Sequence, residues 1–187
     1  MVFLAAVEGG GTSFVVTVAE LTKTENEEKN IPHTRFRILQ QESIPSSSPS
    51  DALTNAVNFF SLNCPEGGYD AVGLATFGPV GVNPQKNDTY GRILPGSPKK
   101  EWRNVDILSP ILKACSTEGG QKPCYKVDTD VNAPALAEFH YQTRHLKNKI
   151  SSLAYVTVGT GVGVGLIINS LPVHGMMHPE GMVKRMM

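Results

Sequence analysis

Two stretches of the chain repeat one pattern, in which an apolar run leads into a glycine-rich turn and a second apolar run follows. Residues 2–19 read VFLAAVEGGGTSFVVTVA, and residues 153–168 read LAYVTVGTGVGVGLII. The runs are short and rich in β-branched residues, which favours strands over helices. Each stretch is therefore predicted to be a pair of strands joined by a tight turn.

Strand and helix patterns alternate between these two stretches. We expect strands at 35–44, within 69–78 and at 123–130, and helices at 51–62, 105–115 and 131–148. Ser50 or Asp51 is expected to cap the first helix. Pro110 is expected to bend the second helix, and Pro134 to lie in the first turn of the third. The polar residues 21–34 predict an exposed loop or hairpin tip.

This order of elements predicts an α/β domain with a mixed sheet over residues 1–150. The second glycine-rich hairpin is then the start of another domain, over residues 151–187, which is too short to be finished. No periodic pattern follows His174. We therefore expect no regular element in the last residues.

The two glycine-rich turns suggest a ligand. A turn without Cβ atoms brings backbone N–H groups and a Thr hydroxyl close to a phosphate. Neither turn is a P-loop, because no Lys-Ser/Thr follows, and neither is a Rossmann fingerprint, because a strand follows rather than a helix. Taken alone, each turn is more typical of a structural hairpin. Together they predict a duplicated fold that holds a polyphosphate from both sides.

Asp130 is the residue that most directly suggests catalysis. It follows a predicted strand and precedes a predicted helix, in the segment DTDVN at 128–132. A helix cap is one interpretation, because Asp is among the residues preferred there. The other is a general base, because ligands of α/β sheets bind at the carboxyl ends of strands and a helix dipole keeps a carboxylate ionised.

Composition excludes several classes of protein. The 17 basic and 17 acidic residues cancel, so the chain lacks the positive charge of a nucleic-acid binder. No apolar run approaches the ~18 residues of a membrane span. The three cysteines have neither a zinc spacing nor an even number, and predict reduced thiols in a cytoplasmic protein.

Taken in order, several segments resemble the ROK family of sugar kinases, and most of all its bacterial-type fructokinase branch. They are EGGGTS at 8–13, FGP at 77–79, YGRI at 90–93, SPKKEW at 97–102, TDVNAPALAE at 129–138, YVTVGTGVGVG at 155–165 and HGMMHPE at 174–180. The resemblance runs from about residue 3 to residue 181. It implies an actin-like ATPase (ribonuclease H-like) fold, with ATP, Mg²⁺ and a hexose between two domains.

The resemblance also implies roles for individual residues. Asp130 would take the proton from a sugar hydroxyl, and Glu8 would lie near Mg²⁺. The remaining assignments are phosphate binding by Gly10, Gly11, Thr12, Gly159, Thr160 and Gly161, and sugar binding by Thr129, Asn132 and Glu180. The implied activity is ATP-dependent phosphorylation of a hexose, with fructose 6-phosphate the expected product. A homodimer is left open, and neither nucleic acid nor a membrane is an expected partner.

The chain also departs from the family pattern. Ser13 stands where a Lys usually follows the GGT turn, and Gly181-Met182-Val183 replaces the segment that carries a conserved His. The Cys/His segment of the family's structural zinc is missing. We therefore expect a C-terminally truncated form with weak activity or none, and a non-catalytic sugar-binding or regulatory isoform is the alternative.

Overall fold

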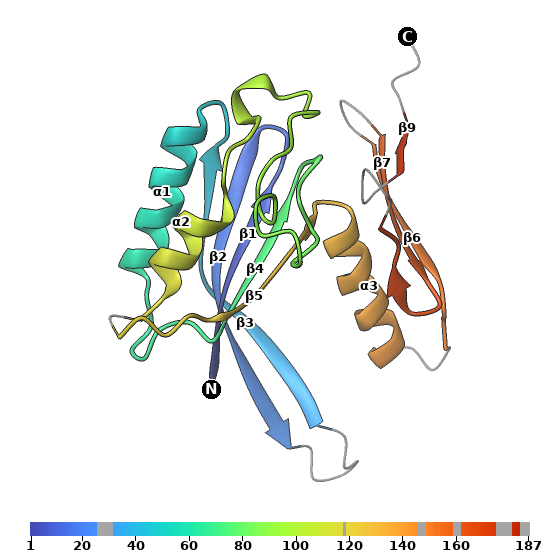
Figure 1. The fold of residues 1–187 in the computed structure, drawn as a ribbon. Helices are drawn as coiled ribbons and strands as arrows, with labels where there is room; N and C mark the ends of the chain where they lie inside the picture. The colour runs from blue at the N-terminus through green and yellow to red at the C-terminus, as the bar shows by residue number, and fades with distance from the viewer. Residues whose placement is uncertain (26–31, 118, 146–148, 159–161, 175–180, 184–187) are drawn as a thin grey trace.

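The computed structural model describes residues 1–25, 32–117, 119–145, 149–158, 162–174 and 181–183. Its first half is built on a mixed five-stranded sheet in the order β3-β2-β1-β4-β5 (Figure 1). The strands are β1 (Val2–Gly9), β2 (Ser13–Glu25), β3 (Pro32–Pro45), β4 (Ala71–Thr76) and β5 (Cys124–Thr129). β1 to β3 pair antiparallel, whereas β1, β4 and β5 are parallel. The predicted mixed sheet is confirmed.

Two helices cover one face of this sheet (Figure 1). They are α1 (Pro49–Leu62) and α2 (Leu108–Cys115), and they enclose the main apolar core with the inward-facing residues of the strands. A short 3-10 helix, η1 (Lys100–Trp102), interrupts the long connection between β4 and α2. Its Trp102 is buried against Phe14, with ring centroids 4.9 Å apart, and so anchors this connection to β2.

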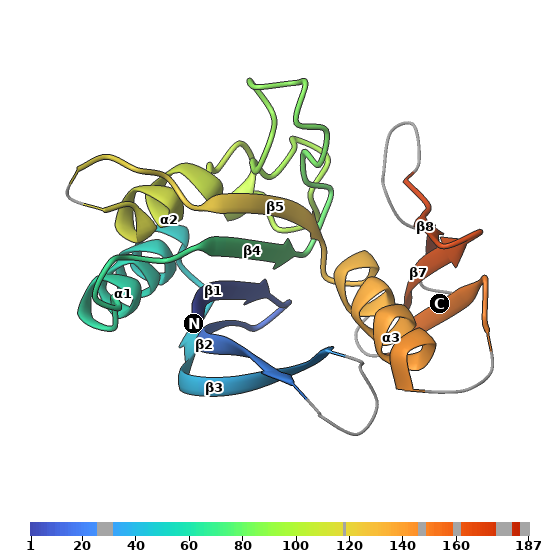
Figure 2. The same cartoon turned by 90° about the horizontal axis from the view of Figure 1, so that it is seen from below.

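A second sheet lies beyond the third helix, α3 (Asn132–His145). It consists of β6 (Leu153–Val158), β7 (Val162–Ile168) and β8 (Leu171–Pro172), with β9 (Gly181–Val183) paired to β7. α3 packs on β6 and β7, so that it lies between the two sheets (Figure 2). β9 corrects the expectation that no regular element follows His174. The domain boundary expected at residue 150 stays a prediction.

A glycine allows this close packing of α3 on the second sheet. A Cβ on Gly165 would lie 2.1 Å from the carbonyl oxygen of Val131, just before the helix. No side chain fits there, because real Cβ atoms do not approach backbone so closely. The alternating glycines of β7 therefore let another backbone come near, as their spacing in the sequence predicts.

The polar region at 21–34 is not a simple loop. β2 continues to Glu25 and β3 begins at Pro32, so the two strands form a long hairpin that extends past the sheet (Figure 1). Residues 26–31 lie outside the described part. Of the two predicted forms, a hairpin tip agrees with this pairing, whereas a loop over the whole of 21–34 was wrong, because residues 21–25 and 32–34 are paired as strands.

The predicted helix ends also need correction. Ser48, rather than Ser50 or Asp51, caps α1, and its hydroxyl accepts a hydrogen bond from the backbone N–H of Asp51 at 3.4 Å. Pro110 is the third residue of α2, where its missing N–H is not needed, so it does not bend that helix. No helix among the described residues is both long and apolar enough to cross a bilayer.

Candidate active site

Three parallel strands end side by side at one edge of the first sheet. Gly9 of β1 is in register with Thr76 of β4, and Thr76 is in register with Thr129 of β5. The glycine turn, the Phe77-Gly78 segment and Asp130 follow directly after these ends. Because ligands of α/β sheets bind beyond the carboxyl ends of strands, this edge is the candidate active site.

The turn between β1 and β2 is tight on one side and open on the other. The N–H of Gly10 donates to the carbonyl of Ser13 at 2.8 Å and closes the turn. A Cβ on Gly9 would lie 2.5 Å from Oγ1 of Thr76, whereas a Cβ on Gly11 would meet no atom within 4 Å. Gly9 is thus required by packing, while space remains in front of Gly11 for a ligand to approach the backbone.

Asp130 is held at this edge by the backbone of the neighbouring strand. Its N–H donates to the carbonyl of Thr76 at 3.0 Å, so the parallel pairing of β4 and β5 continues one residue past β5. The start of α3 is fixed next to it, because the N–H of Asn132 donates to the Thr129 hydroxyl at 3.1 Å. Asp130 as a whole residue is half-buried.

Thr129 and Asn132, the expected sugar-binding pair, are both fully buried. The amide of Asn132 donates to the carbonyl of Val173 at 3.1 Å, which joins α3 to the segment after β8. Their hydrogen bonds therefore hold the backbone on either side of Asp130. Their place along a sugar pocket stays a prediction.

The donor set at this edge suits a magnesium-bound nucleotide. The hydroxyl of Thr76 is fully buried and finds no hydrogen-bond partner among the described residues. Glu8 is exposed and, with Asp128, lines a cavity of about 630 Å³ between the sheet and α3. In the described part of the chain no three His, Cys, Asp or Glu side chains gather to hold a metal. The exposed carboxylate of Glu8 is a ligand of the kind that Mg²⁺ takes, since this ion is commonly held by one or two carboxylates together with phosphate oxygens.

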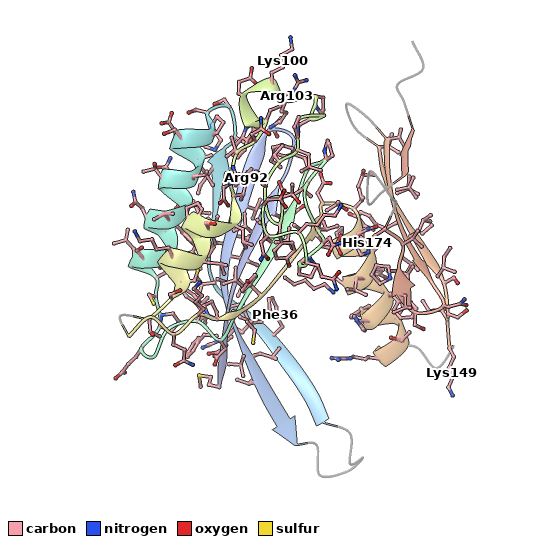
Figure 3. All side chains as sticks on the ribbon, in the orientation of Figure 1. Phe36, Arg92, Lys100, Arg103, Lys149 and His174 are labelled. Carbon is pink, nitrogen blue, oxygen red and sulfur yellow. The ribbon has the colours of Figure 1, made fainter. Side chains whose placement is uncertain are left out.

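A contact that the sequence did not reveal joins the two halves of the site. Nε2 of His174 lies 3.2 Å from both carboxylate oxygens of Asp128. Asp128 is on β5, and His174 follows β8 of the second sheet, so His174 reaches across between the sheets (Figure 3). Asp128 is also fixed by the N–H of Thr129, at 2.9 Å from Oδ1.

Sequence reasoning also missed Lys99. Its ammonium lies 3.0 Å from Oγ of Ser46 and 4.4 Å from the centroid of the Phe77 ring. Burial lowers the pKa of Lys99, and the nearby Glu101 raises it in part. The sequence did contain one signal for Lys99. The segment SPKKEW at 97–102 carries two lysines, and Ser13 stands after the glycine turn where the family usually has a Lys.

Four expected ligand residues lie outside the described part of the chain. These are Gly159, Thr160, Gly161 and Glu180. The strands that flank the second turn, β6 and β7, are described and pair antiparallel. The second hairpin is therefore present, and the roles of these four residues stay predictions.

The mixed sheet with helices on one face and the second sheet beyond α3 define an actin-like α/β fold. The ROK family model matches residues 4–182, and the chain belongs to the ROK family. A fructokinase of Zymomonas mobilis is 33% identical over 93% of this chain and 50% of its own length. A fructokinase of Streptococcus mutans is 34% identical over 94% of this chain and 50% of its own.

A solved structure agrees with this fold. The ROK glucokinase of Streptomyces griseus, solved in complex with glucose and AMPPNP, superposes with a TM-score of 0.58 at 22% identity, over 94% of this chain and 47% of its own. The chain thus spans about half the length of the curated relatives it matches.

Proposed function

We propose that this chain serves the ATP-dependent phosphorylation of a hexose, with fructose the expected sugar. The observation that carries the proposal is the position of Asp130, one residue past β5 and hydrogen-bonded to Thr76, at the edge where the glycine turn ends β1. The names of the similar proteins support the reaction, because several are fructokinases and one was solved with glucose and an ATP analogue.

In this proposal Asp130 acts as the general base. Its carboxylate accepts the proton of the sugar hydroxyl as that oxygen attacks phosphorus. Magnesium-bound ATP, when present, supplies the phosphoryl group. The backbone N–H groups of Gly10 and Gly11 and the hydroxyl of Thr12 would bind its phosphates, and the Glu8 carboxylate would lie toward the metal.

The remaining expected residues complete the proposal. Gly159, Thr160 and Gly161 would hold phosphates from the second hairpin, and Glu180 would bind the sugar. Thr129 and Asn132 would lie along the same sugar pocket. A cytoplasmic location, a homodimer and the absence of the family's zinc site stay predictions.

A coupled kinase assay tests the proposal and identifies the sugar. The purified chain is given ATP, Mg²⁺ and either fructose, glucose or mannose, and ADP formation is followed. Because the chain spans about half the length of its relatives, we expect ADP formation to be slow or absent, and any sugar-dependent rate to be highest with fructose. A rate with glucose or mannose above that with fructose would overturn the fructose assignment. No ADP formation with any hexose from the folded chain would overturn catalysis by this chain itself and favour the non-catalytic alternative.

Calorimetry distinguishes the alternative, a non-catalytic sugar-binding protein, from a kinase. Heat of binding with a hexose, together with no ATP turnover, would favour a non-catalytic sugar-binding protein. No heat with any hexose would count against that alternative.

A further inference from the structure

Lys99 carries a partly buried charge that the fold does not neutralise. Its Nζ lies over the Phe77 ring, at 4.4 Å from the centroid, and 5.9 Å from the Trp102 ring. Among the described residues it makes no ion pair. Removing an ammonium from water without an opposite charge is costly. Aromatic faces and one hydroxyl compensate in part, and an anionic ligand would complete the site.

The space in front of Lys99 leads to the glycine turn. Lys99 lines a cavity of about 310 Å³, and the other lining residues are Gly11, Thr12, Ser46, Ser47, Glu101 and Trp102. One wall of this cavity is the open side of the turn, where a Cβ on Gly11 would meet no atom. A ligand at the turn therefore lies beside the Lys99 ammonium.

The cavity wall contains one cation, Lys99, and further cations follow on the same segment. Lys100 and Arg103 lie on the same segment, at the end of the molecule toward which β1 runs (Figure 3). Glu101 is the one carboxylate in the cavity wall, and it is exposed. In the cavity wall Lys99 is the more buried of the two charged groups, and so its ammonium, rather than the exposed Glu101, lacks solvent to balance its charge and favours an anionic ligand.

Ser46 connects Lys99 to the turn through three hydrogen bonds. Its N–H donates to the carbonyl of Thr12 at 3.0 Å, and its carbonyl accepts from Nε1 of Trp102 at 2.9 Å. Its hydroxyl accepts from Nζ of Lys99 at 3.0 Å. Ser46 is 2% exposed, so these bonds are shielded from water. The turn and the ammonium are thus held in a fixed relation before a ligand arrives.

From this arrangement we infer that Lys99 is a phosphate-binding residue, which contacts a terminal phosphate of a polyphosphate held at the Gly10–Thr12 turn, with Ser46 as its positioning residue. The inference rests on the proposed function, since it names a further contact to the same ligand. Lys99 then supplies the positive charge that Ser13 does not provide. Inorganic tripolyphosphate carries the same chemistry without a nucleoside.

Isothermal titration calorimetry with tripolyphosphate and Mg²⁺ tests this inference. We expect Lys99→Met to weaken binding by at least about tenfold, because a charge-assisted hydrogen bond is lost. Lys99→Arg should restore most of the affinity. Lys113→Met, which removes an exposed cation of α2, is the matched control and should bind as the wild type does. Equal affinity of Lys99→Met and wild type, or no binding by the wild type, overturns the inference.

Chemical labelling keeps the test decisive if Lys99→Met does not fold. Wild-type protein is acetylated with and without tripolyphosphate, and the modified lysines are identified by mass spectrometry. We expect tripolyphosphate to protect Lys99 and not Lys113. Equal labelling of Lys99 in both samples contradicts the inference.

The two proposals fail in different ways. Tripolyphosphate binding that depends on Lys99, from a chain that phosphorylates no hexose, supports the anion site and overturns catalysis by this chain itself. Hexose phosphorylation with an unchanged KM for ATP in Lys99→Met supports the kinase function and overturns the role of Lys99.

Discussion

At the scale of single residues, the end of β1 is shaped by contact with β4. Gly9 lies against the buried side chain of Thr76, and Gly11 two residues later faces open space. The two glycines look equivalent in the sequence, but the first is required by packing and the second is free for ligand approach. This difference depends on which strand pairs with β1, which the local sequence does not contain.

Gly9→Ala should destabilise the fold by about 1–3 kcal/mol, because the added Cβ overlaps Oγ1 of Thr76 and approaches Phe14. Urea unfolding measures the change. Gly11→Ala is the control and should stay within about 0.5 kcal/mol of wild type. Equal stability of the two variants would contradict the packing described for Gly9.

Cys115 should be unreactive in the folded protein, because burial raises the pKa of its thiol to about 12. Iodoacetamide at pH 8 should modify the exposed Cys64 and Cys124 and spare Cys115 until urea is added. Mass spectrometry identifies the modified residues. Fast modification of Cys115 in the native chain would contradict its burial in the core.

The Cys115 thiol also makes the free energy of unfolding decrease at alkaline pH. The unfolded thiol titrates near its ordinary pKa of 9.0, whereas the folded thiol stays protonated up to about 12. The unfolded chain therefore binds fewer protons between these values, and this contribution to stability falls as pH rises through that window. Cys115→Ala should have a smaller loss of stability over the same pH range, as measured by urea unfolding.

The part of the site that could not be predicted from the sequence is the part formed by contacts between residues far apart in the chain. Asp130 and the glycine turn could be predicted, because strand ends and turns have local signals. Lys99 and Ser46 are far apart in the chain and meet only through the packing of Trp102. Asp128 and His174 likewise meet only once the second sheet lies against α3.

At the scale of elements, most helices and strands follow from hydrophobic periodicity, and their ends do not. The start of α1 illustrates the reason. Pro49 is suited to the first helical position, which makes Ser48 the cap, but Asp51 offers a competing acidic signal two residues later. A hairpin tip at 21–34 was among the predictions, but the length of β2 and β3 was not, since the sequence of their outer part has no apolar alternation.

Ser48→Ala should cost about 1 kcal/mol of stability, because the hydroxyl that accepts from Asp51 N–H is removed. Ser50→Ala is the matched control inside α1 and should be neutral or slightly stabilising, since Ala is the better helix former. Thermal and urea unfolding compare the two. A larger loss of stability in Ser50→Ala than in Ser48→Ala would show that Ser50, one of the two residues predicted from the sequence, is the cap.

At the scale of the whole molecule, two sheets are joined through α3 and through the segment after β8. His174 contacts Asp128 of β5, and Val173 accepts a hydrogen bond from Asn132 at the start of α3. Both contacts lie beside Asp130. The order of the second sheet is therefore coupled to the site at the edge of the first.

His174→Ala should loosen the second sheet and leave the first intact. Hydrogen exchange is expected to become about tenfold faster in β6 and β7 and to stay unchanged in β1 and β4, because the contact between His174 and Asp128 is lost. The double variant with Asp128→Asn should be no worse than the more severe single variant. Additive effects of the two changes would show that the His174–Asp128 contact does not couple the sheets.

The most direct test of the central claim compares hexose phosphorylation by wild type and by Asp130→Asn. The variant keeps the size of the side chain and removes the group that accepts the proton. We predict a fall in kcat of at least about a hundredfold with little change in KM for ATP. Asp88→Asn, in an exposed loop, should keep the wild-type rate. An Asp130→Asn variant that phosphorylates the sugar as fast as wild type would contradict the account.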